Sequence, residues 1–224
     1  MRNLFQEQMK DLNRSLLEMG GYIEYAIDAA VKALINQDIA LAKKIVEFDL
    51  EIDQKERDIE NFCLRVLLQQ QPVASDFRKV FAILKMITDM ERIGDQSADI
   101  SEITLILEKD IYIKEFRHMR QMAEAAIQMV HQSVDAFVQE DIELAEAVIR
   151  SDDIVDHYFV VIREELCEII QKNPIHVHQA FDLMMVTKYL ERIGDHATNI
   201  AEWVVYSITG SHPMDVAVNK QVEG

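Results

Sequence analysis

The chain has 224 residues, and its 40 acidic against 23 basic side chains give a formal charge of −17. This charge argues against nonspecific nucleic-acid binding, because neutralising phosphates needs clustered Lys and Arg. The hydrophobic content of 49% supplies material for a core and excludes global disorder. Six Gly and three Pro are too few for the many turns of an all-β or α/β fold, so the composition predicts long helices.

Six amphipathic stretches follow one another along the chain, each with apolar residues at i, i+3, i+4 and i+7. Polar caps at residues 36–38 and 139–141 separate the first helix from the second in each half, and Pro72 and Pro174 separate the second from the third. Such short connections place consecutive helices antiparallel. The predicted helices cover 5–36, 38–70, 75–108, 112–139, 141–171 and 175–208.

The second half of the chain repeats the first. Residues 33–53 align with 136–156, and the pentapeptide Glu-Arg-Ile-Gly-Asp occurs at 91–95 and again at 191–195. The sequence therefore predicts an all-α fold of two tandem up-down three-helix bundles, produced by internal duplication. We place the first bundle at 1–110, the second at 111–210 and a C-terminal tail at 211–224.

Acidic residues form a row beside the buried stripe on the second and third helices of each half. At 100° per residue the two rows lie on shoulders of the same rotational sense, which meet when the helices run antiparallel. In the first half both rows lie about 30 Å from the turn at Pro72, at about 1.5 Å per residue. Four carboxylates should therefore come together in each copy: Asp49, Asp53, Glu91 and Asp95, then Asp152, Asp156, Glu191 and Asp195.

Four unpaired carboxylates repel one another and raise each other's pKa. Hard cations, or a carboxylate-bridged iron or manganese cluster, would remove that repulsion. The alternative is a solvated face whose acids pair with Arg57, Arg92 and Arg192. Gly94 and Gly194 lie on the buried stripe beside the acids. Because glycine inside a helix costs about 1 kcal/mol relative to alanine, they predict a close approach of the helices. This approach serves either packing alone or the shape of the site.

The other polar signals are weaker. Glu115 and His118 form one Glu-x-x-His pair, whereas ferritin-like di-iron sites need two. His157 and His196 follow acidic candidates directly, and we assign both to the solvent face. No phosphate-binding loop or nucleophile motif is present, so we assign no catalytic residue.

The expected location is the cytoplasm. The N-terminus lacks the apolar core of a signal peptide, and no apolar run approaches the length of about 18 residues that a membrane span needs. We therefore expect no direct membrane insertion. Cys63 and Cys167 lie in apolar helical patterns without CxxC spacing, which predicts buried free thiols in a reducing compartment.

The two Glu-Arg-Ile-Gly-Asp segments, with MGGYIEYAI (19–27), NQDIALAKKIVEFD (36–49) and QQQPVASDFRKV (69–80), closely resemble the PhoU family of phosphate-signalling regulators. The resemblance covers about residues 5–210 and again implies two three-helix bundles. It further implies a non-enzymatic adaptor that restrains phosphate-starvation signalling and phosphate uptake. The implied partners are the ATPase subunit of the phosphate ABC transporter and a membrane sensor histidine kinase. Unpaired bundle faces also favour a homodimer.

Some members of the family bind multinuclear metal clusters at acidic motifs of the form Glu/Asp-x-x-x-Asp. The resemblance adds Asp99 to the first set of acids and Asn199 to the second. Asn199 offers an amide oxygen without a charge, so we expect weaker metal binding in the second copy. Oxygen-rich sites of this kind accept Fe, Mn, Mg or Zn.

Two further hypotheses belong to other classes of protein. The facing acid rows would also suit a carboxylate-bridged metal enzyme or an iron-storage bundle, although the missing second Glu-x-x-His pair argues against it. The third possibility is a helical scaffold whose acids only keep it in solution.

Overall fold

The structure, a computed structural model, describes residues 2–107 and 117–211. All predicted helices are present in these ranges, and their bounds agree with the predictions to within a few residues. The predicted start of the fourth helix at residue 112 lies outside the described residues. The helices are α1 (Arg2–Asn36), α2 (Ile39–Gln70), α3 (Ala74–Leu107), α4 (Arg117–Gln139), α5 (Ile142–Lys172) and α6 (Val177–Thr209), with a short 3-10 helix η1 (Pro174–His176) before α6.

The predicted caps at the first turn of each bundle are confirmed. The Asp38 carboxylate accepts the backbone N–H of Leu41 (2.9 Å) at the start of α2, and Asp141 accepts that of Leu144 (3.0 Å) at the start of α5. Each satisfies a backbone N–H group that has no partner inside the helix. Because the caps are identical and at equivalent positions, the second helix begins in the same way in both bundles.

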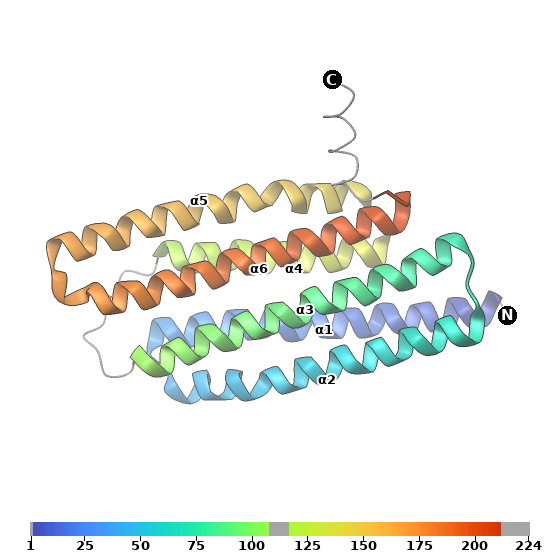
Figure 1. Ribbon diagram of the computed structural model, residues 1–224, viewed down its shortest axis with the longest axis horizontal. Helices are drawn as coiled ribbons and strands as arrows, with labels where there is room; N and C mark the ends of the chain where they lie inside the picture. Colours follow the sequence, from blue (N-terminus) through green and yellow to red (C-terminus); the bar gives the residue numbers. More distant parts are fainter. Residues whose placement is uncertain (1, 108–116, 212–224) are drawn as a thin grey trace, which may run out of the picture.

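The six helices form two layers (Figure 1). The front layer runs in the order α2, α3, α6, α5, and α1 and α4 lie behind it. Helices α3 and α6 lie antiparallel at the centre and join the two bundles, with a second contact between α1 and α4. The prediction of two up-down three-helix bundles is confirmed, and the bundles lie side by side.

One hydrophobic core extends through both bundles. In α1 the fully buried side chains recur with helical spacing, as in Leu12, Leu16, Met19 and Ile23. Each such side chain stabilises the fold by about 1.5–3 kcal/mol relative to an exposed one. No helix in the described ranges is both long enough and apolar enough to cross a membrane.

The two cysteines differ in their environment. Cys63 is buried, as predicted, and burial raises the pKa of its thiol to about 12. Cys167 is exposed, so the expectation of two buried thiols is wrong for this residue. Cys167 follows the buried Leu166 and is therefore rotated by about 100° from the core face of α5.

Candidate functional site

Helices α2 and α3 approach each other closely at Gly94. A Cβ atom at this position would lie 2.9 Å from Asp49 Oδ1 and 3.0 Å from Ile52 Cγ2. At the equivalent Gly194 a Cβ atom would lie 3.2 Å from Asp152 Oδ1. The predicted close approach of the helices is confirmed, and in each bundle glycine leaves room for an aspartate of the neighbouring helix.

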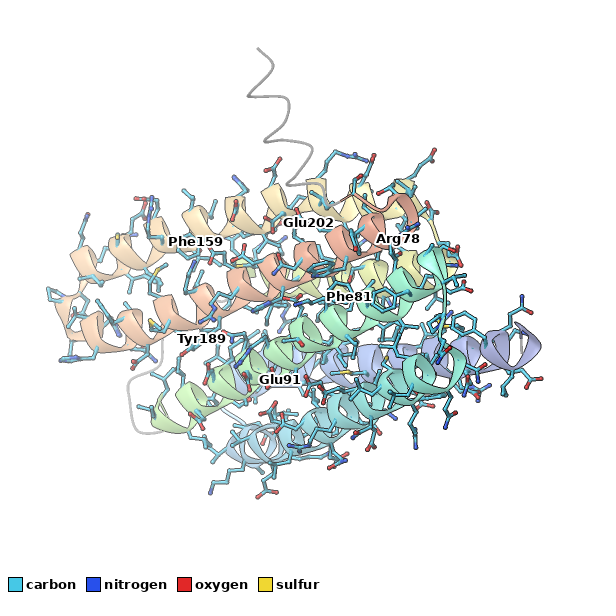
Figure 2. All side chains as sticks on the ribbon, turned by 45° about the vertical axis from the view of Figure 1, so that its right-hand side comes forward. Arg78, Phe81, Glu91, Phe159, Tyr189 and Glu202 are labelled. Atoms are coloured by element: carbon cyan, nitrogen blue, oxygen red, sulfur yellow. The ribbon has the colours of Figure 1, made fainter. Side chains whose placement is uncertain are left out.

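The first acidic cluster lies along this seam, where Glu91 is on the side of α3 that faces α2 (Figure 2). Burial, together with the charges of Asp95, Asp53, Glu91 and Asp99, raises the pKa of Asp49 to about 6. Burial also raises the pKa of Glu91, as does the nearby charge of Asp95. The structure thus brings the acids of the two rows together as the helix geometry predicted.

The second acidic cluster occupies the seam between α5 and α6. Burial raises the pKa of Asp152 to about 6, with contributions from Asp156, Asp195 and Glu191 among others. Burial and then Glu191 raise the pKa of Asp195, while the Lys188 ammonium lowers it. The four predicted acids of the second copy are therefore also neighbours.

Basic side chains partly neutralise both clusters. Arg92 bonds Asp95 (2.8 Å) and lies 3.4 Å from Glu91, and Lys188 bonds Glu191. Arg57 lies 3.8 Å from Asp53. Arg57 and Arg92 thus contact the acids as expected, and the charge of Arg192, the third expected partner, lowers the pKa of Asp99. Exposed ion pairs contribute only about 0–1 kcal/mol each.

Glu56 joins the first cluster, although it was not predicted. Burial raises its pKa, and its charge in turn contributes to the raised pKa of Glu91. Its position was readable from the sequence, because Glu56 lies about 20° from Asp49 around the helix. The equivalent residue in the second bundle is Phe159, over whose ring the Lys188 ammonium lies at 5.7 Å. The two clusters therefore differ chemically.

Asn199 and Asp99 turn towards the central contact of α3 and α6. The Asn199 amide donates to Asp89 Oδ1 (3.1 Å), and His196 Nδ1 lies 2.8 Å from the same oxygen. At the equivalent position across the contact, the Tyr189 phenol hydrogen-bonds to Asp99. These two residues, which the family motif adds to the metal ligands, thus connect the bundles to each other.

The histidine expectations had mixed outcomes. His157 is exposed, as expected. His196 is not on the solvent face: only 18% of its side chain is exposed, because it packs against Asp89 of the other bundle. His118 Nδ1 lies 2.5 Å from Glu165 of α5, and its proposed partner Glu115 lies outside the described residues.

The chemistry of the first cluster suits a hard cation. Asp49 Oδ1 is buried and has no hydrogen-bond partner among the described residues, and its neighbours supply further carboxylate oxygens. In the described ranges, however, no three His, Cys, Asp or Glu side chains are arranged to hold one ion together. The acids are assembled in one place, and binding an ion requires side-chain rotation that brings their oxygens onto it.

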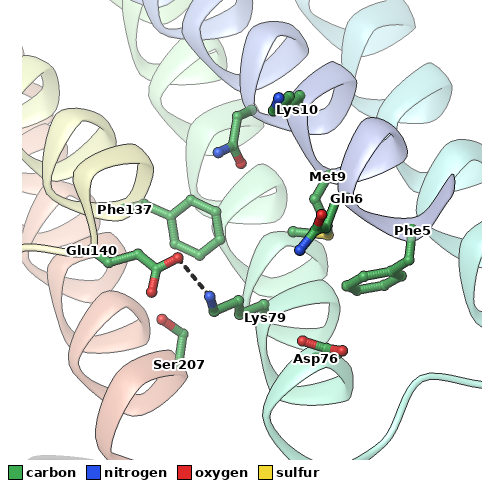
Figure 3. Close-up of a pocket in the computed structure, with 10 residues that line it drawn as sticks. Phe5, Gln6, Met9, Lys10, Asp76, Lys79, Phe137, Glu140 and Ser207 are labelled. Carbon is green, nitrogen blue, oxygen red and sulfur yellow. Dashed lines mark hydrogen bonds and ion pairs between the residues drawn. The ribbon is translucent and has the colours of Figure 1, made fainter. Parts of the chain in front are cut away.

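A cavity of about 470 Å³ lies away from both clusters, where α1 and α3 begin and α4 and α6 end (Figure 3). Phe5, Met9 and Phe137 form its apolar part. Across it Lys79 of α3 bonds Glu140 (2.5 Å), which connects the two bundles. The cavity contains none of the predicted acidic residues.

The comparisons with known proteins agree with the duplicated fold. The PhoU domain model matches twice, over residues 16–104 and 119–204, which is one match in each bundle. The chain belongs to the PhoU family. Among its PhoU relatives, the "Phosphate-specific transport system accessory protein PhoU homolog" of Pseudomonas aeruginosa is 34% identical, over 98% of this chain and 91% of the relative. The protein of the same name from Clostridium acetobutylicum is 35% identical, over 93% of this chain and 96% of its own.

Two PhoU crystal structures share this fold. The PhoU structure from Pseudomonas aeruginosa matches with a TM-score of 0.86 and 35% identity, over 92% of this chain and all of that one. The "phosphate transport system regulatory protein PhoU" from Streptococcus pneumoniae matches with a TM-score of 0.84 and 27% identity, over 93% and 98% of the two chains. The expected family is therefore confirmed.

Proposed function

We propose that the protein is a cytoplasmic negative regulator of phosphate-starvation signalling and phosphate uptake. The observation that carries this proposal is the pair of PhoU domains, one in each bundle, shared with relatives named as accessory proteins of phosphate-specific transport. In this role the protein is an adaptor between the ATPase subunit of the phosphate ABC transporter and a sensor histidine kinase. It acts by binding these two partners, and it does so as a homodimer.

The proposed role involves no catalysis. Hydroxyl groups inside the bundles donate to backbone carbonyls of their own helices, as Ser97 does to Ile93 (2.9 Å) and Thr187 to Leu183 (2.8 Å). The buried Cys63 thiol stays protonated at neutral pH because its pKa is raised to about 12. Side chains held in this way are poor nucleophiles, which supports the adaptor role.

The proposal includes metal ions at the acidic clusters. Asp49, Asp53, Glu91 and Asp95 would hold them in the first bundle, with Asp99 nearby, and their counterparts in the second would be Asp152, Asp156, Glu191 and Asp195, with Asn199 nearby. A bound Fe, Mn, Mg or Zn ion would supply positive charge that relieves the repulsion between the carboxylates. The buried and unpartnered Asp49 Oδ1 supports this assignment. A metal-enzyme role gains no such support, because the single Glu-x-x-His motif has no second copy.

Deleting the gene tests the regulatory role. We expect phosphate-starvation genes to be expressed, and phosphate uptake to increase, in cells grown with abundant phosphate. A plasmid copy should restore repression. If the deletion strain keeps these genes silent and its uptake unchanged, the proposed function is wrong. Binding of the purified protein to the ATPase subunit and to the cytoplasmic part of the kinase then tests each contact directly.

A further inference from the structure

Helix α6 begins with a row of exposed apolar side chains. Val177, Phe181 and Met185 recur every fourth residue, so they lie along one side of the helix. Their exposed fractions are 40%, 72% and 41%. We call these three residues the α6 stripe. A row of large apolar side chains left in water is costly, and such surfaces mark contact sites more often than single exposed residues do.

Phe77, the counterpart of Val177, is also exposed (47%), but the counterpart of Phe181 is covered by its own chain. Phe81, the counterpart of Phe181, meets the rings of Trp203 (6.1 Å) and Tyr206 (6.2 Å) of α6 edge-on. Lys85, the counterpart of Met185, extends over the Phe81 ring at 5.7 Å. Aromatic packing and a lysine thus cover Phe81 in the first bundle, whereas Phe181 stays exposed in the second.

In the part of α3 that the structure describes, the last turns offer no aromatic side chain to cover Phe181. A shift of 100 residues, which relates the two Glu-Arg-Ile-Gly-Asp segments, places Ile103 and Ile106 where the other bundle has Trp203 and Tyr206. Ile106 is itself 66% exposed. Phe181 is therefore exposed at one end of the contact between α3 and α6, whereas Phe81 is covered at the other.

The hydrogen bond between Tyr189 and Asp99 fixes the level of α3 beside the α6 stripe. Phe181 lies eight residues before Tyr189 and Ile106 seven residues after Asp99, distances of about 12 Å and about 10 Å along antiparallel helices. Figure 2 places Tyr189 and Phe81 at the contact of α3 and α6, towards opposite ends. Ile106 therefore extends the α6 stripe onto α3.

Acidic residues border this surface. Asp99 accepts the Tyr189 hydrogen bond, and the charge of the exposed Glu102 raises the pKa of Tyr189, while the charge of Arg192 lowers it. A second copy would bring further negative charge to this acidic border, so it is a poorer occupant of this particular surface than a basic partner. A partner that combines apolar side chains with Lys or Arg complements both the centre and the border.

We propose that the α6 stripe and Ile106 dock an amphipathic segment of the transporter's ATPase subunit, whose apolar side chains are bordered by basic ones. The inference rests on the proposed adaptor function and adds the surface and the chemistry of the contact. Apolar burial supplies the affinity at the centre, and Glu102 and its neighbours attract the basic border. The four apolar residues of this surface belong to neither acidic cluster, although Asp99 at its border also contributes to the first cluster.

Two double variants test the inference. F181Q/M185Q replaces two of the three residues of the α6 stripe, and I154Q/V160Q replaces two exposed apolar side chains of α5, with exposed fractions of 50% and 46%. Because all four residues are on the surface, both variants should fold, which circular dichroism and thermal unfolding would verify. Binding of each to the purified ATPase subunit is measured by biolayer interferometry at low and at high salt.

We expect F181Q/M185Q to weaken binding by about tenfold or more, corresponding to about 1.4 kcal/mol or more. I154Q/V160Q should bind like the wild type, and high salt should weaken wild-type binding. Equal binding by all three proteins would overturn the docking surface and leave the adaptor function standing. A wild type that does not bind would overturn both. Loss of self-association in F181Q/M185Q, seen by analytical ultracentrifugation with ATPase binding intact, would make the surface a self-interface and refute the proposal.

Discussion

The acidic cluster of the first bundle should destabilise the free protein at neutral pH. Asp49 has a pKa of about 6 in the folded protein against an ordinary value of 3.8, chiefly because burial disfavours its charge. The folded state therefore binds the Asp49 proton more tightly than the unfolded state does. The contribution of this residue to stability falls as the pH rises from about 4 to about 6, and the loss is complete above pH 6.

A pKa of about 6 instead of 3.8 corresponds to nearly 3 kcal/mol, at 1.36 kcal/mol per pKa unit, but Asp49 is only partly buried, so solvent screens its charge. A contribution of about 1–2 kcal/mol is the realistic expectation. Asp49→Asn removes the charge with little change of shape. It should therefore raise the free energy of unfolding by about 1–2 kcal/mol at pH 7.5 and have little effect at pH 4.

Urea unfolding with a chelator present, at both pH values, measures this difference. Glu47→Gln on the exposed side of α2 is the matched control and should change stability little at either pH. If Asp49→Asn lowers stability by the same amount at both pH values, the carboxylate contributes a structural hydrogen bond, and the account of repulsion in a partly buried cluster is wrong.

Three further predictions concern the seams between helices. Gly94→Ala should lower the free energy of unfolding by about 1–3 kcal/mol, because its Cβ would lie 2.9–3.0 Å from Asp49 and Ile52. Gly21→Ala should raise the free energy of unfolding by up to about 1 kcal/mol, because its Cβ would meet no neighbouring atom within 4 Å. Denaturant titration of both variants measures this, and equal effects would contradict the close approach. Asp89→Ala leaves His196 and Asn199 without their acceptor and should lower stability by about 1–3 kcal/mol by the same assay; an unchanged midpoint would show that the bond contributes nothing. Mn²⁺ should raise the melting temperature of the wild type at pH 7.5, and raise it less in Asp95→Ala, as scanning calorimetry would show; an equal rise in both would exclude Asp95 as a ligand.

The features that sequence reasoning predicted depend on short-range geometry. Helix lengths follow from hydrophobic periodicity and from polar caps such as Asp38 and Asp141, and short connections fix antiparallel neighbours. The same arithmetic brought Asp49 and Asp95 together, because two helices joined by one turn keep a fixed level relative to each other. Glu56 obeys the same rule and was overlooked only because the motif did not include it.

The contacts between the bundles could not be predicted in this way. No turn joins α3 to α6 directly, so their relative level and rotation depend on how two finished bundles pack. Asp99 and Asn199 show the consequence: a repeating motif predicts one role for both, but docking gives Asp99 a tyrosine and Asn199 an aspartate as partner.

The 100-residue repeat also suggests equal surfaces at both ends of the contact. Packing makes them unequal, since Phe81 meets two aromatic rings while Phe181 stays exposed. The contact surfaces of α3 and α6 therefore differ between the bundles, and the repeat in the sequence does not predict how each one packs.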